Sequence, residues 1–159
     1  MEKILVSRCL LGHAVRYDGG SFDPQEQLLR WQAEGRVVAV CPEVAGGLPT
    51  PRPPAEIPGG QGASVLDGLL PVLTVDGDDV TAAFVRGADR AVQLASSHNI
   101  RFALLKARSP SCGNHENYDG NFNGTRVTGE GVTAAALRRS GVKVFNEDEI
   151  EQLVALLAV

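Results

Sequence analysis

The chain has 159 residues, of which 43% are hydrophobic and 21% are charged, and its formal net charge is −4. This composition is typical of a folded globular protein, and no apolar run approaches the about 20 residues that a membrane span requires. The negative net charge excludes general attraction to nucleic-acid backbones. The length fits a single domain, residues 1–159, whose hydrophobic core needs no disulfides.

The chain begins with "MEKILVSRCL", in which residues 3–7 form a short apolar run. The segment has no long apolar region and no small-residue cleavage site, so it predicts a strand and not a signal peptide. We therefore expect a cytoplasmic protein. Its three cysteines are an odd number for such a setting, which favours free thiols, a metal site or a catalytic thiol over a disulfide framework.

Strand-like and helix-like segments alternate along the chain. Continuous apolar runs predict buried strands at residues 3–7, 36–40, 101–106 and 143–146. Helical patterns occupy residues 23–35, 81–98, 129–141 and 146–158, with Asp23 and Asn146 as expected N-caps. This alternation predicts an α/β fold, a three-layer Rossmann-like domain with a parallel sheet and helices on both faces.

Two segments depart from this alternation. Residues 71–81, "PVLTVDGDDVT", predict a small β-hairpin turning at Asp76 and Gly77. Residues 42–68 are rich in proline and glycine and have no period, which predicts a long loop, and such loops in compact domains are usually either functional or disordered. Gly87 interrupts the helix expected at 81–98, and we attribute it to a close packing contact.

Each cysteine follows a predicted strand. Cys9 and Cys41 come directly after the first and second strands, and Cys112 follows the third by a few residues. Carboxyl ends of parallel strands meet at one edge of a sheet, so we expect the three thiols to converge there. Isolated buried cysteines are the alternative. Three thiolates suit an open metal centre, either zinc with His13 or His115 as fourth ligand, or an iron-sulfur cluster with one iron free.

Other polar residues accompany the cysteines. Glu43 follows Cys41 by two residues and Ser109 precedes Cys112 by three, so both could move protons in a shared site. Twelve of the fifteen basic residues are arginines, and several of these stand in glycine- and proline-rich loops, a pattern suited to binding a small phosphate or carboxylate.

A glycine-rich stretch, "GEGVTAAAL", opens the helix expected at 129–141 and could bind an anion through its backbone N–H groups. We take a further set of residues as candidates for phosphate or base binding: Arg16, Arg52, Lys106, Gly129, Gly131, Val132 and Thr133. Two loops, "RYDGGSF" and "NYDGNF", resemble each other, and their aromatic residues could pack on a planar ring.

Taken together, "CLLG", "RYDGG", "CPEVAGGLPTPRPPAE", "KARSPSCG", "YDGNF" and "GEGVTAAAL" resemble the thiouracil desulfidase family over nearly the whole chain. The resemblance implies a [4Fe-4S] cluster bound by Cys9, Cys41 and Cys112, with a free iron for the thiocarbonyl sulfur. It also implies Glu43 and Ser109 as acid/base residues.

The activity implied by the resemblance is hydrolytic removal of sulfide from a thiolated uracil compound. The short chain matches the stand-alone form of the family, so we expect 4-thiouridine 5′-monophosphate, and not tRNA, as substrate, giving UMP and hydrogen sulfide. Two rival interpretations remain at this point. One is a zinc-dependent hydrolase or deaminase that uses the three cysteines, and the other is a non-enzymatic iron-sulfur sensor or carrier.

Overall fold

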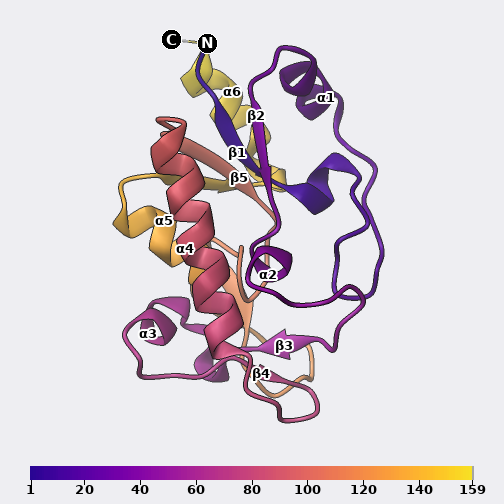
Figure 1. Ribbon diagram of the computed structural model, residues 1–159, viewed down its shortest axis with the longest axis vertical. Coiled ribbons are helices and arrows are strands. Elements are labelled where there is room, and N and C mark those ends of the chain that lie inside the picture. The colour runs from indigo at the N-terminus through magenta and orange to yellow at the C-terminus, as the bar shows by residue number, and fades with distance from the viewer. Residues whose placement is uncertain (159) are drawn as a thin grey trace.

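A parallel sheet of four strands forms the centre of the computed structural model, which describes residues 1–158 (Figure 1). The sheet order is β2-β1-β5-β8, so the first strand is internal. Its strands are β1 (Ile4–Ser7), β2 (Val37–Val40), β5 (Phe102–Leu105) and β8 (Lys143–Asn146). All four expected strands are confirmed; the apolar residues of the internal strand β1 and most of those of β5 are buried, whereas the edge strand β2 is only partly covered.

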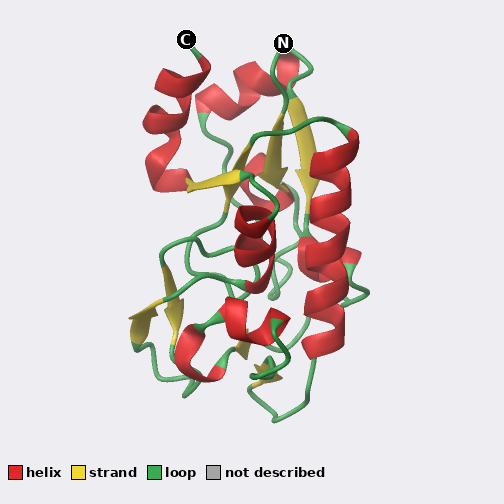
Figure 2. Ribbon diagram, turned by 90° about the vertical axis from the view of Figure 1, so that its left-hand side faces the viewer, coloured by secondary structure: helices red, strands yellow, loops and turns green. Residues whose placement is uncertain are grey.

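Helices cover both faces of the sheet (Figure 2). The helices are α1 (Glu26–Ala33), α4 (Thr81–Ser97), α5 (Val132–Arg139) and α6 (Ile150–Leu157). Leu5 belongs to the core cluster formed with α4 and α5, whereas Ile4 and Val6 belong to the cluster formed with α1 and α6. Because successive strand side chains point to opposite faces, this division confirms the three-layer α/β fold.

Helix ends differ in part from expectation. Asp23 is not the cap of α1, because the first amide hydrogen bonds of that helix go to the Gln25 carbonyl, two residues later. Asn146 is a cap, as expected: its side chain accepts from Asp148 N–H and Glu149 completes a capping box. The capped element is a 3-10 turn, η3 (Glu147–Glu149), that leads directly into α6.

The stretch at residues 42–68 is not a structureless loop. It contains α2 (Pro42–Ala45), β3 (Ala55–Glu56), the 3-10 turn η2 (Pro58–Gly60) and α3 (Gly62–Leu66). These elements are too short to leave a periodic pattern, and they are held by contacts with distant parts of the chain. Among these contacts are those of α2 with α4 and of α3 with α5.

The expected hairpin at 71–81 is present as a turn, but its main pairing is different. β4 (Leu73–Thr74) pairs antiparallel with β3, and a single bridge joins Leu73 to Asp79 across the turn. A second hairpin, β6 (Glu116–Tyr118) with β7 (Arg126–Thr128), was not expected. Both small sheets lie beyond the carboxyl ends of the central strands (Figure 1).

Gly87 sits where α2 crosses α4. A Cβ at this position would overlap the Pro42 carbonyl oxygen, so glycine is required for the two helices to approach. Arg86 strengthens the contact by donating two hydrogen bonds to the Gly46 carbonyl, at 2.9 and 3.2 Å. The expected close contact is therefore confirmed, and it fixes α2 directly after Cys41. Within residues 1–158, no helix is long and apolar enough to cross a bilayer.

Candidate active site

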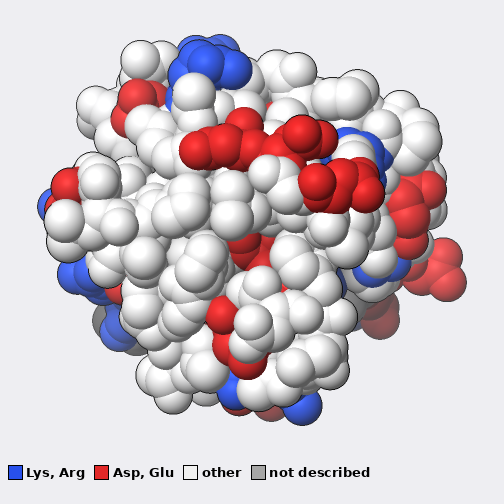
Figure 3. Space-filling view, turned by 90° about the horizontal axis from the view of Figure 1, so that it is seen from below, with Lys and Arg blue, Asp and Glu red and all other residues white. Residues whose placement is uncertain are grey.

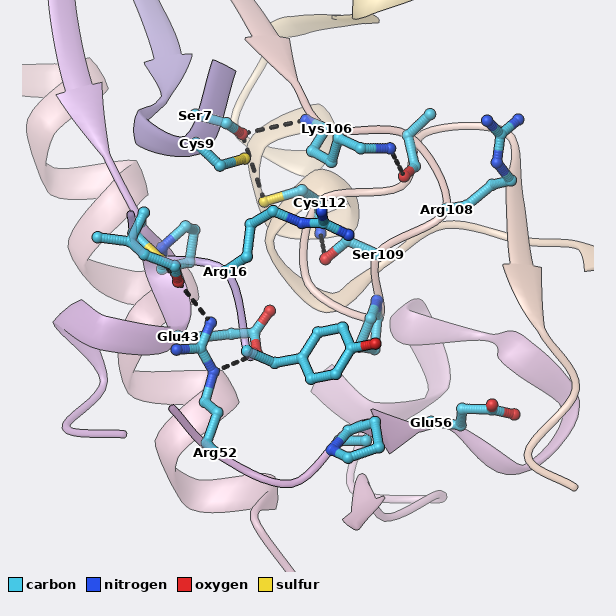
Figure 4. A pocket seen from close by; sticks show the side chains of 18 of the residues that line it. Ser7, Cys9, Arg16, Glu43, Arg52, Glu56, Lys106, Arg108, Ser109 and Cys112 are labelled. Carbon is cyan, nitrogen blue, oxygen red and sulfur yellow. Dashed lines mark hydrogen bonds and ion pairs between the residues drawn. The ribbon is translucent and has the colours of Figure 1, made fainter. Parts of the chain in front are cut away.

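A cavity of about 690 Å³ opens at the carboxyl ends of β1, β2 and β5, and all three cysteines line it. Cys9 lies in the 3-10 turn η1 (Arg8–Leu11), directly after β1. Cys41 joins β2 to α2, and Cys112 lies in the loop after β5. Figure 4 shows the Cys9 and Cys112 sulfurs turned toward each other, with Glu43 entering the cavity from another side. The expected convergence of the cysteines is found.

Cys112 is held by two serines. The Ser109 hydroxyl oxygen accepts hydrogen bonds from the backbone N–H groups of Ser111 and Cys112, each at 3.1 Å, and so closes the turn that presents the cysteine. The Ser7 hydroxyl donates to the Cys112 sulfur at 3.7 Å. Ser109 Oγ is thus occupied as an acceptor, while its own proton is free to donate into the cavity.

The thiols of Cys9 and Cys112 are poor acids in this setting. Burial, together with a smaller effect of the neighbouring Cys41, raises the pKa of Cys9 to about 11. Burial also raises the pKa of Cys112, with further contributions from the other two cysteines. A cationic metal group would relieve this clustering of sulfur ligands, because it binds thiolates and displaces their protons. The donor set is all sulfur, which soft metals and iron-sulfur clusters prefer.

The spacing of the ligands disfavours a single metal ion. Within residues 1–158, no three His, Cys, Asp or Glu side chains are arranged to hold one ion. His13 does not line the cavity and accepts a hydrogen bond from Arg8 Nε at 3.1 Å. His115 pairs with Glu149 at 2.9 Å, outside the cavity. Neither histidine is therefore placed as the fourth ligand that a three-cysteine zinc centre needs.

Glu43 projects from α2 into the cavity, and Arg52 holds it there. Arg52 Nε donates to Glu43 Oε1 at 3.0 Å, and the guanidinium side chain is only 5% exposed. Its other nitrogens donate to the carbonyls of Val15 and Pro49 and to Thr50 Oγ1. Burial raises the pKa of Glu43, and the Arg52 charge and hydrogen bond only partly oppose it. Arg52 therefore organises the carboxylate and is not a free anion-binding group.

Lys106 is likewise engaged. Its ammonium group forms an ion pair with Glu147 Oε2 at 2.8 Å and donates to the Ala107 carbonyl at 2.9 Å. Glu147 Oε1 also accepts from the Ala107 N–H at 2.7 Å. Glu147 thus fixes the start of the loop that carries Cys112.

Arg16 and Arg108 are the guanidinium groups of the cavity wall with no ion-pair or hydrogen-bond partner within residues 1–158. Arg16 lies over the Phe22 ring, with its central carbon 4.4 Å from the ring centroid. The two similar loops noted in the sequence both reach this cavity and supply its aromatic wall: Tyr17, Phe22, Tyr118 and Phe122.

The structure does not bring the glycine-rich helix start into the cavity. None of Gly129, Gly131, Val132 and Thr133 lines it. Their backbone N–H groups already donate to carbonyl oxygens of residues 110–115, including Val132 to Pro110 at 2.9 Å and Thr133 to Ser111 at 2.8 Å. The amides of these four residues therefore support the cysteine loop and are not available to a phosphate.

Three residues of the site were missed by sequence reasoning: Ser7 and Glu56, which line the cavity, and Glu147, which supports its wall through Lys106 and Ala107. Ser7 ends an apolar strand two residues before Cys9, and this polar break was a usable signal. Glu56 accepts from the N–H groups of Gly120 and Phe122, and Glu147 does so from Ala107. These contacts join distant segments, so no local pattern could reveal them.

Comparisons with known proteins agree with this geometry. A family model described as 2-thiouracil desulfurase matches residues 4–149. The uncharacterized protein YbbK of Bacillus subtilis (strain 168) is 42% identical over 151 residues, covering 95% of this chain and 99% of YbbK. A solved structure described as a [4Fe-4S]-dependent thiouracil desulfidase, TudS, is 52% identical, covers 99% of both chains and has a TM-score of 0.90.

Proposed function

This chain belongs to the 2-thiouracil desulfurase family, and from that premise we propose that it removes sulfur from a thiolated uracil compound with the aid of a [4Fe-4S] cluster. The observation that carries the proposal is the single cavity that gathers Cys9, Cys41, Cys112 and Glu43. A sensor or cluster carrier needs sulfur ligands, but it has no need for a carboxylate and an aromatic wall beside them.

Cys9, Cys41 and Cys112 would hold the cluster. A [4Fe-4S] cluster ordinarily takes four thiolates, so three protein ligands leave one iron open. When bound, the cluster supplies a soft Lewis acid that polarises the thiocarbonyl group and stabilises departing sulfide. Within residues 1–158 no three side chains of the kinds that bind metals are arranged to hold one ion, which is compatible with a larger group.

Glu43 is placed to act on water. Its Oε1 is held by Arg52, and its Oε2 has no hydrogen-bond partner within residues 1–158. We assign Oε2 as acceptor of the proton from the water that attacks the ring carbon. The C–O bond forms, the C–S bond breaks, and the sulfur leaves as hydrogen sulfide after taking up protons. The reaction is a hydrolysis and needs no oxidant or reductant.

Ser109 is assigned to donate a hydrogen bond to the reacting thiopyrimidine. Its oxygen is occupied by the N–H groups of Ser111 and Cys112, which leaves its proton to point elsewhere. The hydroxyl lies in the same loop as a cysteine ligand and lines the cavity (Figure 4). One residue thus serves both to shape the loop and to contact substrate.

We take 4-thiouridine 5′-monophosphate as the preferred substrate. Aromatic side chains suit a planar pyrimidine, and the unpaired guanidinium groups of Arg16 and Arg108 suit a phosphate. The structure gives less support for a long polyanion such as tRNA as the substrate. The face seen from below carries a group of acidic side chains and no continuous basic surface (Figure 3).

Anaerobic reconstitution with iron and sulfide, followed by incubation with 4-thiouridine 5′-monophosphate, tests the proposal. We expect equal amounts of hydrogen sulfide and UMP and repeated turnover. A Cys112→Ser variant is the control and should lose the activity with the cluster. A reconstituted protein that binds the cluster but releases no sulfide from any thiouracil compound would contradict the proposal and favour a sensor or carrier.

A further inference from the structure

We propose that Ser7 is a positioning residue that hydrogen-bonds the Cys112 sulfur and makes this ligand electronically different from Cys9 and Cys41. The inference rests on the proposed function, in which the three cysteines hold an iron-sulfur cluster. Ser7 is the last residue of β1 and is 2% exposed. It lies where two neighbouring strands, β1 and β5, both end at the cavity.

The hydrogen bonds of Ser7 fix the direction in which its hydroxyl proton points. Its oxygen accepts a hydrogen bond of 3.1 Å from the backbone N–H of Lys106, which directly follows the neighbouring strand β5. A hydroxyl has one proton, and that of Ser7 is directed at Cys112 Sγ, 3.7 Å away. Ser7 is buried, so no solvent competes for this proton. The Lys106 amide thus orients the Ser7 hydroxyl so that it donates its proton to the Cys112 sulfur (Figure 4).

The other two cysteines receive no such donor. Within residues 1–158, Cys112 is the one cysteine whose sulfur accepts a hydrogen bond. Cys41 instead faces an acceptor, the Val15 carbonyl oxygen, at 3.9 Å. Hydrogen bonds to an ionised acceptor are roughly twice as strong as neutral ones, so the Ser7 proton favours the thiolate that ligates metal over a free thiol.

This asymmetry has two consequences for a bound cluster. Hydrogen bonds to ligand sulfur withdraw electron density and are among the factors that set the reduction potential of iron-sulfur clusters. Partners of metal ligands also fix the ligand's orientation, and losing them typically costs about 10- to 100-fold in metal affinity or activity. Ser7 is therefore expected to raise the reduction potential and to slow the loss of the cluster.

The chain offers a matched control. Ser111 is also fully buried and adjoins Cys112, but its hydroxyl pairs with Thr133 Oγ1 at 2.8 Å and with no sulfur. Replacing either serine by alanine removes one buried hydroxyl; Ser111→Ala leaves Thr133 Oγ1 without its partner, and Ser7→Ala leaves both the Lys106 N–H and the Cys112 sulfur without theirs. Only the Ser7 change removes a hydrogen bond to a cysteine.

The test compares anaerobically reconstituted wild type with Ser7→Ala, Ser7→Thr and Ser111→Ala. We expect Ser7→Ala to lower the reduction potential and to speed the loss of visible cluster absorbance in air about ten-fold. Ser7→Thr keeps the hydroxyl, so its reduction potential and its rate of cluster loss should stay near the wild-type values. The reduction potential of Ser111→Ala should also stay near the wild-type value. Equal potentials and equal loss rates in Ser7→Ala and wild type would overturn the inference.

A measurement on the unmutated protein covers the case in which Ser7→Ala does not fold. Resonance Raman spectra of the wild-type cluster in H₂O and D₂O should differ in the iron–cysteine stretching bands, because the Ser7 proton exchanges. The absence of any isotope shift in these bands would also overturn the inference. A wild-type protein that assembles no cluster under these conditions would instead contradict the proposed function.

Discussion

Arg52 and Glu43 form a nearly buried ion pair at the cavity wall, with Arg52 Nε 3.0 Å from Glu43 Oε1. The pair leaves one carboxylate oxygen toward the cavity and fixes the other. Arg52 also joins two further parts of the chain, because it donates to Val15 and to the adjacent residues Pro49 and Thr50. Glu43 therefore has a chemical role and Arg52 a supporting one, and substitutions at the two positions should have different effects.

Glu43→Gln should reduce kcat for sulfide release by about 10²- to 10⁴-fold, since an amide cannot accept the proton of the attacking water. The amide keeps the size of the side chain and an oxygen for Arg52, so the cluster content should stay at the wild-type level. Sulfide assays and iron analysis on the same preparations provide the measurement. Glu56→Gln, at a carboxylate that only accepts from backbone amides, is the control, and wild-type turnover in Glu43→Gln would exclude the assignment.

Arg52→Met should destabilise the fold by about 3–5 kcal/mol, because it leaves the Glu43 carboxylate buried without its partner. Denaturant unfolding measures the loss. Arg52→Lys should recover only part of it, because an ammonium group cannot reproduce the planar fork that contacts four acceptors. The ratio of kcat/KM for nucleotide over nucleoside should not change in Arg52→Lys, and a selective loss for the nucleotide would show that Arg52 binds phosphate.

Arg16→Gln and Arg108→Gln should each weaken use of 4-thiouridine 5′-monophosphate more than use of 4-thiouridine. Losing a charge-assisted hydrogen bond worth about 1.5–3 kcal/mol lowers kcat/KM by roughly ten-fold or more. Steady-state kinetics with both substrates measure the ratio. Arg30→Gln, on the outer side of α1, is the matched control. Equal losses for the two substrates would remove both arginines from phosphate binding.

Gly87→Ala should destabilise the protein by about 1–3 kcal/mol, although alanine favours a helix by up to about 1 kcal/mol. The added Cβ meets the Pro42 carbonyl and pushes α2 from α4, so kcat should fall along with stability. Thermal unfolding and sulfide release are the measurements. Ser96→Ala, at an exposed position of the same helix, should change stability by less than about 0.5 kcal/mol. A stabilised Gly87→Ala variant would show that the crossing is not tight.

Glu149 should make the free energy of unfolding depend on pH in the acidic range. Burial by itself raises its pKa, but hydrogen bonds from Asn114, His115 and the Asn146 N–H outweigh this and lower the pKa below its ordinary value. A carboxyl group whose pKa is lower in the folded state than in the unfolded state stabilises the fold at pH values above its unfolded-state pKa. This stabilisation is lost as the pH falls through its folded-state pKa. Glu149→Gln should therefore cost about 1–3 kcal/mol at neutral pH and progressively less in acid. Urea unfolding at several pH values measures this, and a pH-independent difference would contradict it.

The sheet and the cysteine site could be predicted from the sequence for one shared reason. Buried parallel strands are continuous apolar runs, and the residues directly after them must meet at one edge, as Cys9 and Cys41 do. The same logic placed Glu43 and Ser109 in the cavity.

Other features depend on contacts between segments far apart in the chain. Arg52 stands in a proline-rich stretch and looks like a ligand-binding arginine until its partners, Glu43 and Val15, are known. The helix start at Gly131 looks like an anion site until its amide is seen to donate to the Gly113 carbonyl. β3 and β4 have two residues each, too few to show a period of any kind.

The amide hydrogen bonds from α5 to the cysteine loop also bear on the order of assembly during synthesis. The loop that presents Cys112 is held from one side by α5 and from another by the Asn114–Glu149 hydrogen bond, at 2.8 Å. Both supports come from residues that follow Cys112 in the chain and therefore leave the ribosome after all three cysteines. Cys9 and Cys41 can therefore emerge and fold before their third partner has a fixed position. Any group that needs all three thiols in place must be inserted after the residues up to Glu149 have been synthesised.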